Sequence, residues 1–147
     1  MSAEKKAVLF VCLGNICRSP ACEGICRDMV GDKLIIDSAA TSGFHVGQSP
    51  DTRSQKVCKS NGVDISKQRA RQITKADFSK FDVIAALDQS ILSDINSMKP
   101  SNCRAKVVLF NPPNGVDDPY YSSDGFPTMF ASISKEMKPF LTEHGLI

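Results

Sequence analysis

A cysteine and an arginine stand six residues apart near the start of the chain, in the stretch VLFVCLGNICRSP at residues 8–20. Cys12 ends an apolar run, and Arg18 stands where a Ser-Pro pair begins a helical pattern. A cysteine thiolate is a strong nucleophile, and a guanidinium offers a planar fork of donors that matches two oxygens of a phosphate. The pair therefore predicts nucleophilic chemistry on a phosphate group.

The residues around this pair suit a loop that wraps an anion. Backbone N–H groups of such a loop point inward, and the following helix adds its unpaired amides and the positive end of its dipole. Gly14 and Asn15 are of the types that adopt left-handed backbone conformations most easily. We expect the Cys12 thiol to ionise readily there, helped by Arg18 and the Ser19 hydroxyl. The alternative is a buried structural cysteine beside an ordinary helix start. The other members of the predicted loop are Leu13, Ile16 and Cys17.

Four continuous apolar runs rich in β-branched residues predict the strands of a parallel sheet that is covered on both faces. These runs are residues 7–12, 34–38, 82–87 and 106–110. Helical patterns occur at residues 19–29, 51–60, 74–81, 90–98 and 127–142. The alternation predicts an α/β fold with a doubly wound, flavodoxin-like sheet of four parallel strands and helices on both faces. Ligands bind at the carboxyl edge of such sheets, where Cys12 is expected.

Length and charge restrict the classes of function. At 147 residues and 16.0 kDa, the chain is predicted to form a single domain over residues 1–147. A net charge of +2 is too mild to predict a nucleic-acid partner. The basic run KQRARQITK at residues 67–75 is either a solvated face or a binding patch, and the first interpretation is favoured.

The cysteines are expected to be reduced and free of metal. The chain has six cysteines, no recognisable secretion signal and no apolar run of membrane-spanning length. These features predict a cytoplasmic protein without membrane attachment. Four cysteines crowd into residues 12–26, but their spacing lacks the Cys-x-x-Cys pattern of structural zinc sites, so no metal is expected.

Several motifs in register identify a family resemblance over nearly the whole chain. Besides the Cys-x5-Arg-Ser loop, they are DSAATSG (37–43), ARQIT (70–74), FDVIAALDQS (81–90) and DDPYY (117–121). The chain resembles the low-molecular-weight protein tyrosine phosphatases. The resemblance implies hydrolysis of phosphotyrosine in proteins, and of small aryl phosphates, through a phosphocysteine. We further expect no cofactor, inhibition by inorganic phosphate and similar oxyanions, and a monomer, although no sequence motif addresses the oligomeric state.

Cleavage of a phosphate ester also needs an acid that protonates the leaving group. The loop GVDDPYYSSDG at residues 115–125 follows the fourth predicted strand and so lies at the same sheet edge as Cys12. The resemblance assigns the acid to Asp118, with Asp117 as a solvated neighbour; the alternative is an ordinary Asp-Pro turn. It also implies aromatic walls that select aryl phosphates, formed by Phe44, Tyr120 and Tyr121.

By the same resemblance, a hydrogen-bond network of Asn15, Ser19 and Ser38 holds the loop in place. The chain departs from the family in one respect, because relatives commonly have a histidine shortly before ARQIT and this chain has Lys67 and Gln68 there. Gln68 is expected to hydrogen-bond to Asn15 in place of that histidine.

Some alternatives remain open from the sequence. Cys17 is either an ordinary loop residue or, as the resemblance implies, a thiol that traps oxidised Cys12 as a reversible disulfide. An arsenate reductase of the same fold would need an extra cysteine pair in mid-chain, yet residues 81–95 contain no cysteine. A phosphotyrosine-binding module without activity would need the loop alone, whereas this chain also has Asp118.

Overall fold

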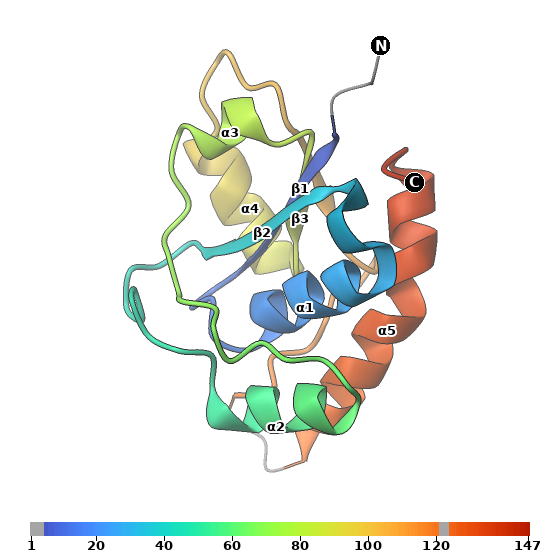
Figure 1. Ribbon diagram of the computed structural model, residues 1–147. Helices are drawn as coiled ribbons and strands as arrows, with labels where there is room; N and C mark the ends of the chain where they lie inside the picture. The colour runs from blue at the N-terminus through green and yellow to red at the C-terminus, as the bar shows by residue number, and fades with distance from the viewer. Residues whose placement is uncertain (1–4, 121–123) are drawn as a thin grey trace.

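The computed structural model describes residues 5–120 and 124–147, and its centre is a four-stranded parallel sheet (Figure 1). The strands are β1 (Ala7–Cys12), β2 (Ile35–Ala40), β3 (Val83–Ala86) and β4 (Lys106–Leu109). They lie in the order β2-β1-β3-β4, and every neighbouring pair is parallel. The predicted doubly wound sheet is thereby confirmed.

Strand β1 occupies the middle of the sheet and is buried along its whole length. Its side chains alternate between two hydrophobic cores, one on each face of the sheet. Val8 and Phe10 belong to one core, and Leu9 and Val11 belong to the other. This two-sided burial explains why the strand is continuously apolar in sequence.

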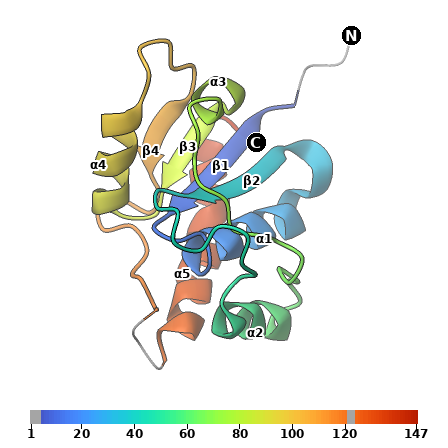
Figure 2. The same cartoon turned by 90° about the vertical axis from the view of Figure 1, so that its left-hand side faces the viewer.

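The helices divide between the two faces of the sheet (Figure 2). They are α1 (Arg18–Val30), α2 (Thr52–Ser60), α3 (Asp77–Lys80), α4 (Gln89–Met98) and α5 (Gly125–Glu143), with a 3-10 turn η1 (Gly31–Lys33) after α1. Helices α1 and α5 pack against one another on one face, and α2 contacts both. Helices α3 and α4 lie on the opposite face.

The predicted helix at 74–81 was wrong in length, because only α3 is helical there. The Asp77 carboxylate explains the late start of this helix. It accepts a hydrogen bond from the backbone N–H of Thr74 at 2.8 Å and is held by the Arg71 guanidinium at 3.0 Å. These bonds stabilise a turn before the helix. The other predicted helices and strands agree with the structure to within a few residues.

The chain order places the carboxyl ends of the strands at one edge of the sheet. Strands β2 and β3 flank β1 on opposite sides, so the strand order reverses at β1, and Cys12 is the last residue of that strand. Such a reversal leaves a crevice at the strand ends, which is where ligands bind in this class of fold. Within residues 5–120 and 124–147, the helices are all too short or too polar to cross a membrane.

Candidate active site

The loop between β1 and α1 wraps around the sulfur of Cys12. Asn15 adopts a left-handed conformation with φ of 58°, which turns its backbone N–H toward Cys12 Sγ at 3.3 Å. Ser19 Oγ lies 3.0 Å from the same sulfur. Because Ser19 Oγ already accepts a hydrogen bond from Asn15 Nδ2 at 2.7 Å, its own hydrogen is available to the sulfur. Two donors therefore face Cys12 Sγ, and both can hydrogen-bond to negative charge on the sulfur.

Asn15 holds the loop through three further contacts of its side chain. Its Nδ2 donates to Ser19 Oγ and, at 3.0 Å, to Ser38 Oγ in β2. Its Oδ1 accepts from the backbone N–H of Arg71 at 3.0 Å. The sequence predicted the contacts among Asn15, Ser19 and Ser38, and the structure brings these residues together.

The structure adds Glu23 to this network, which the sequence analysis did not assign to the site. The Ser38 hydroxyl donates to Glu23 Oε1 at 2.6 Å, and Arg27 donates to Glu23 Oε2 at 2.7 Å. Glu23 is only 7% exposed. Its position among small and apolar residues early in α1 was the available signal, because a charged residue is rarely buried without a partner.

The prediction for Gln68 is wrong in the structure. Gln68 Nε2 donates to the backbone carbonyl of Pro20 at 3.1 Å instead of reaching Asn15. The reason is that the amide of Asn15 has both hydrogens bound to serine hydroxyls and its oxygen bound to the Arg71 backbone. Gln68 thus contacts the start of α1 next to the loop, one step away from the network.

Arg18 is buried, with 3% of its surface exposed, and its guanidinium is held in place from two loops. Its Nη1 donates to Asp88 Oδ2 at 2.7 Å and to the carbonyl of Val116 at 3.0 Å, and its Nη2 lies 3.7 Å from Asp118 Oδ2. Burial acts to lower the pKa of Arg18, but the negative charges of Cys12 and Asp88 outweigh burial and raise it. The guanidinium therefore remains a cation. The sequence analysis did not identify Asp88.

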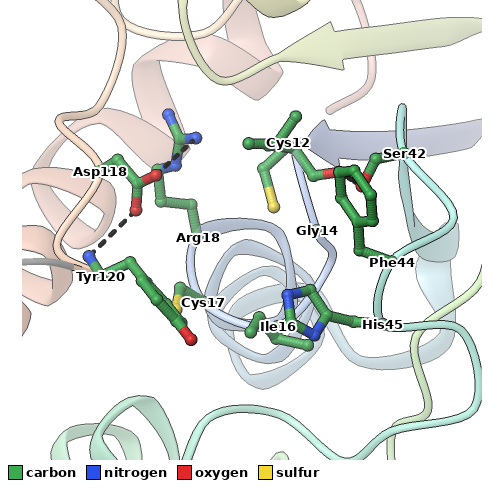
Figure 3. A pocket seen from close by; sticks show the side chains of 11 residues that line it. Cys12, Gly14, Ile16, Cys17, Arg18, Ser42, Phe44, His45, Asp118 and Tyr120 are labelled. Atoms are coloured by element: carbon green, nitrogen blue, oxygen red, sulfur yellow. Dashed lines mark hydrogen bonds and ion pairs between the residues drawn. The ribbon is translucent and has the colours of Figure 1, made fainter.

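Cys12, Arg18 and Asp118 meet at a cavity of about 220 Å³ (Figure 3). The predicted loop residues Leu13, Gly14, Ile16 and Cys17 also line the cavity, as do Ser42, Phe44, His45 and Tyr120. Asp118 is partly exposed and faces the cavity, and its Oδ1 accepts from the Tyr120 backbone N–H at 3.0 Å. A nucleophile, a cation and a carboxylate therefore surround a space that can hold a phosphate ester.

The rim of the cavity contains His45 in addition to the predicted aromatic residues Phe44 and Tyr120. Figure 3 shows Phe44 and His45 across the cavity from Tyr120. Phe44 is 82% exposed, and the imidazole of His45 has its centroid 6.5 Å from that of Tyr120. The Arg53 guanidinium also lies over the Tyr120 ring, with its Cζ 5.4 Å from the ring centroid. Tyr121 lies outside the described residues.

Cys17 lies in the loop and lines the same cavity as Cys12. Burial raises the pKa of the Cys17 thiol, and the nearby negative charge of Asp51 adds to this shift. Cys17 is therefore a neutral thiol when Cys12 is ionised. Among the described residues, no group of three or more His, Cys, Asp or Glu side chains is placed to hold a metal ion.

Comparisons with known proteins agree with this geometry. A family model described as low molecular weight phosphotyrosine protein phosphatase matches residues 7–145. The low molecular weight phosphotyrosine protein phosphatase of Homo sapiens is 44% identical over 149 residues, which cover 92% of this chain and 94% of the human protein.

Solved structures of phosphatases superpose closely on the chain. The solution structure of the low molecular weight protein tyrosine phosphatase from Tritrichomonas foetus is 99% identical, with a TM-score of 0.86, and covers 99% of this chain and 100% of its own. A crystal structure of protein tyrosine phosphatase from Entamoeba histolytica with Hepes in the active site is 32% identical, with a TM-score of 0.86, and covers 97% of this chain and 100% of its own. The chain therefore belongs to the low molecular weight phosphotyrosine protein phosphatase family, as its motifs predicted, and is an enzyme of the cysteine-dependent protein tyrosine phosphatase class.

Proposed function

We propose that this chain hydrolyses phosphotyrosine in two steps, with Cys12 as nucleophile, Arg18 as phosphate clamp and Asp118 as acid and then base. The observation that carries the proposal is the convergence of these three side chains on one cavity. In the first step the Cys12 thiolate attacks phosphorus, the bond from phosphorus to the phenolic oxygen breaks, and Asp118 gives its proton to that oxygen. The products of this step are tyrosine and a phosphocysteine.

In the second step a water molecule replaces the sulfur on phosphorus. Asp118, now a carboxylate, takes a proton from the water, and the Cys12 thiolate leaves with the electron pair of its bond to phosphorus. Inorganic phosphate is released and Cys12 returns to its starting state. Arg18 and the loop amides stabilise the charge on the equatorial oxygens in both steps.

The rim of the cavity supports an aryl substrate. Phe44 and Tyr120 provide apolar ring surface on opposite sides of the opening, and Tyr121 is proposed to extend the second wall. Small aryl phosphates should be accepted as well, because they need no contact beyond this rim. Oxyanions such as inorganic phosphate should compete for the loop, a proposal supported by the Hepes, a sulfonate, in the Entamoeba histolytica active site. The described groups that the mechanism needs lie on one chain, so we propose that the enzyme acts without a residue from a second copy.

The test is turnover of p-nitrophenyl phosphate by the wild-type chain and by Cys12→Ser. Loss of the thiol should lower kcat by at least about 10³-fold, because a serine hydroxyl is far less acidic than a thiol, and Asp118 must carry its proton as the acid in the first step and cannot then activate the hydroxyl. Cys103→Ser is the matched control, since Cys103 lies in the connection before β4, and it should retain wild-type turnover. Activity should also persist in excess chelator. A fully active Cys12→Ser variant would show that the nucleophile is another group.

Cys17 is proposed to protect Cys12 from oxidation. Peroxide converts the Cys12 thiolate to a sulfenic acid, and the Cys17 thiol then attacks that sulfur to form a disulfide and water. Both residues line the same cavity, which supports this reaction. Dithiothreitol should restore activity after peroxide treatment in the wild type and in a Cys58→Ser control, and restore much less in Cys17→Ser. Equal recovery of all three proteins would overturn the proposal. A reducing, cytoplasmic location would keep both thiols available.

A further inference from the structure

We propose that His45 determines substrate specificity by binding a carboxylate side chain next to the phosphotyrosine of the substrate. This inference rests on the function proposed above. His45 lines the cavity but has no part in the two chemical steps, and the motifs of the sequence assigned it no role. Figure 3 shows His45 at the cavity beside the loop residues Gly14 and Ile16, and we expect the residues that flank a bound phosphotyrosine to lie near it.

The ring of His45 is held in a defined orientation by two contacts. Its Nδ1 lies 3.0 Å from Gln48 Oε1, and because an amide oxygen only accepts, Nδ1 carries the hydrogen. The ring edge rests on the phosphate-binding loop, where a Cβ on Gly14 would lie 2.8 Å from His45 Cδ2. With Nδ1 occupied, Nε2 is the atom that remains for a ligand, and within residues 5–120 and 124–147 it has no hydrogen-bond partner.

The charges around the cavity make His45 the suitable group for a second anion. Among the described residues that line the cavity, the basic ones are Arg18 and His45. Arg18 is already paired with Asp88 and is the proposed ligand of the phosphate. Arg53, which lies over the Tyr120 ring, already donates two side-chain hydrogen bonds to Asp51. A flanking carboxylate at the rim therefore has the protonated imidazole as its available partner.

Protonation of His45 controls whether Nε2 donates or accepts. An imidazolium donates from both nitrogens, whereas the neutral ring with hydrogen on Nδ1 can only accept at Nε2 and repels a carboxylate. The ionisable groups that line the same cavity as the ring are Cys12, Cys17, Arg18, Asp118 and Tyr120, and the Asp51–Arg53 pair adjoins it through the contact of Arg53 with Tyr120. The preference for an acidic neighbour should accordingly be present at acidic pH and fade as the solution becomes alkaline.

The experiment compares two phosphopeptides that differ only beside the phosphotyrosine, one with glutamate on both sides and one with glutamine on both sides. The ratio of their kcat/KM values is measured at pH 5.5 and pH 8.0. This ratio cancels the ionisation of the phosphate, Cys12 and Asp118, which are common to both peptides. For the wild type, we expect the glutamate peptide to be favoured by about threefold to tenfold at pH 5.5 and by less than about twofold at pH 8.0.

Two variants separate the charge of His45 from its shape. His45→Asn removes the titrating group, so the ratio should be close to one at both pH values. His45→Arg carries a permanent charge, so its preference for glutamate should persist at pH 8.0. Turnover of p-nitrophenyl phosphate, which has no flanking residues, is measured for each variant as the reference for any general effect on the cavity, and the ratio of the two peptides is the readout because it cancels such an effect.

The outcomes distinguish this inference from the proposed function. Failure of the wild type to turn over p-nitrophenyl phosphate would reject the function itself. Normal turnover with a peptide ratio that is independent of pH, or that is unchanged in His45→Asn, would overturn the role of His45 alone. Thermal unfolding of both variants near the wild-type temperature is expected, because His45 lies at the surface of a loop.

Discussion

The Arg18 guanidinium and the Asp88 carboxylate are joined at 2.7 Å, although 70 residues separate them in the chain. Asp88 divides its two oxygens between two tasks. Oδ2 accepts from Arg18, and Oδ1 accepts from the backbone N–H of Ile91 and so caps the start of α4. The position of the phosphate clamp therefore depends on the helix that follows β3. Asp118, 3.7 Å from the same guanidinium, is the alternative partner if Asp88 is lost.

Asp88→Asn should lower kcat/KM for aryl phosphates by about tenfold to a hundredfold. Without the charge on Asp88, the guanidinium is expected to move toward Asp118, so the clamp is misplaced and the acid is held as a carboxylate. The asparagine oxygen can still cap α4, so thermal stability should change little. Steady-state kinetics and thermal unfolding measure the two effects. Asp88→Ala, which also removes the cap, should unfold with about 0.5–2 kcal/mol less stability. Unaltered kinetics in Asp88→Asn would mean that Arg18 is positioned by Val116 alone.

Asp118→Asn should slow substrates with poor leaving groups more than those with good ones. Phenolate needs a proton when it leaves and p-nitrophenolate needs it much less, so the expected losses in kcat/KM, which reports the step that releases the phenol, are about 10²-fold to 10³-fold for phenyl phosphate and about tenfold for p-nitrophenyl phosphate. Asp117→Asn is the matched control, because Asp117 is an exposed neighbour that does not line the catalytic cavity. Equal losses on both substrates would place the acid elsewhere.

Asn15 combines a left-handed backbone with three side-chain hydrogen bonds, and two variants separate these contributions. Asn15→Gly keeps the backbone conformation and loses the amide, which should lower stability by roughly 1–3 kcal/mol. Asn15→Ala should lose about 1 kcal/mol more, since alanine avoids φ of 58°. Denaturant unfolding measures both, and kcat/KM should follow the same order. Identical stabilities would show that the loop relaxes away from the left-handed conformation.

The sequence predicted the parts of the site that depend on local pattern. Strand β1, the helix start at Arg18 and the Gly-Asn turn between them are all encoded within a dozen residues. Asp88 and Glu23 were missed because their roles depend on which strands become neighbours. The contact between Asn15 and the Arg71 backbone also depends on which distant segments become neighbours. It explains why the prediction for Gln68 was wrong. The side-chain oxygen of Asn15 accepts its hydrogen bond from the backbone N–H of Arg71, and the pattern of side chains in the sequence does not reveal where that backbone group lies.

Gly115→Ala should displace the loop that holds Asp118. Gly115 has φ of 78°, and a Cβ there would lie 2.8 Å from the Cα of Asp88 and closer still to the carbonyl oxygen of Leu87. The substitution should cost about 2–3 kcal/mol of stability and reduce kcat/KM at least about tenfold, because Val116 also contacts Arg18.

The control for Gly115 is Gly62→Ala. Gly62 has φ of 82°, close to that of Gly115, but a Cβ there meets no atom within 4 Å. It should therefore show the cost of the backbone conformation alone, about 1 kcal/mol, with normal activity. If chemical denaturation gives the same loss for both variants, close packing against the backbone of Leu87 and Asp88 has no part in holding the loop.

His144 should make the stability of the fold depend on pH. Its Nδ1 is buried without a hydrogen-bond partner among the described residues, and its ring packs on Phe140 with centroids 4.7 Å apart. Burial lowers the pKa of His144, and Lys106 adds to this shift while Glu143 opposes it. On acidification, the His144 imidazole is protonated at a higher pH in the unfolded chain than in the folded one. The contribution of neutral His144 to the free energy of unfolding is therefore complete above the unfolded pKa of about 6.5 and declines as the pH falls below it.

Replacement of His144 by phenylalanine keeps the ring and removes the titration. The free energy of unfolding, measured by denaturant at pH 7.5, 6.5 and 5.5, should fall less steeply with decreasing pH in His144→Phe than in the wild type. His144→Gln also loses the aromatic contact with Phe140, so it should be less stable than His144→Phe at every pH. Its free energy of unfolding should change with pH as little as that of His144→Phe, because neither side chain takes up a proton. Parallel pH profiles for the wild type and His144→Phe would show that other groups cause the acid sensitivity of the fold.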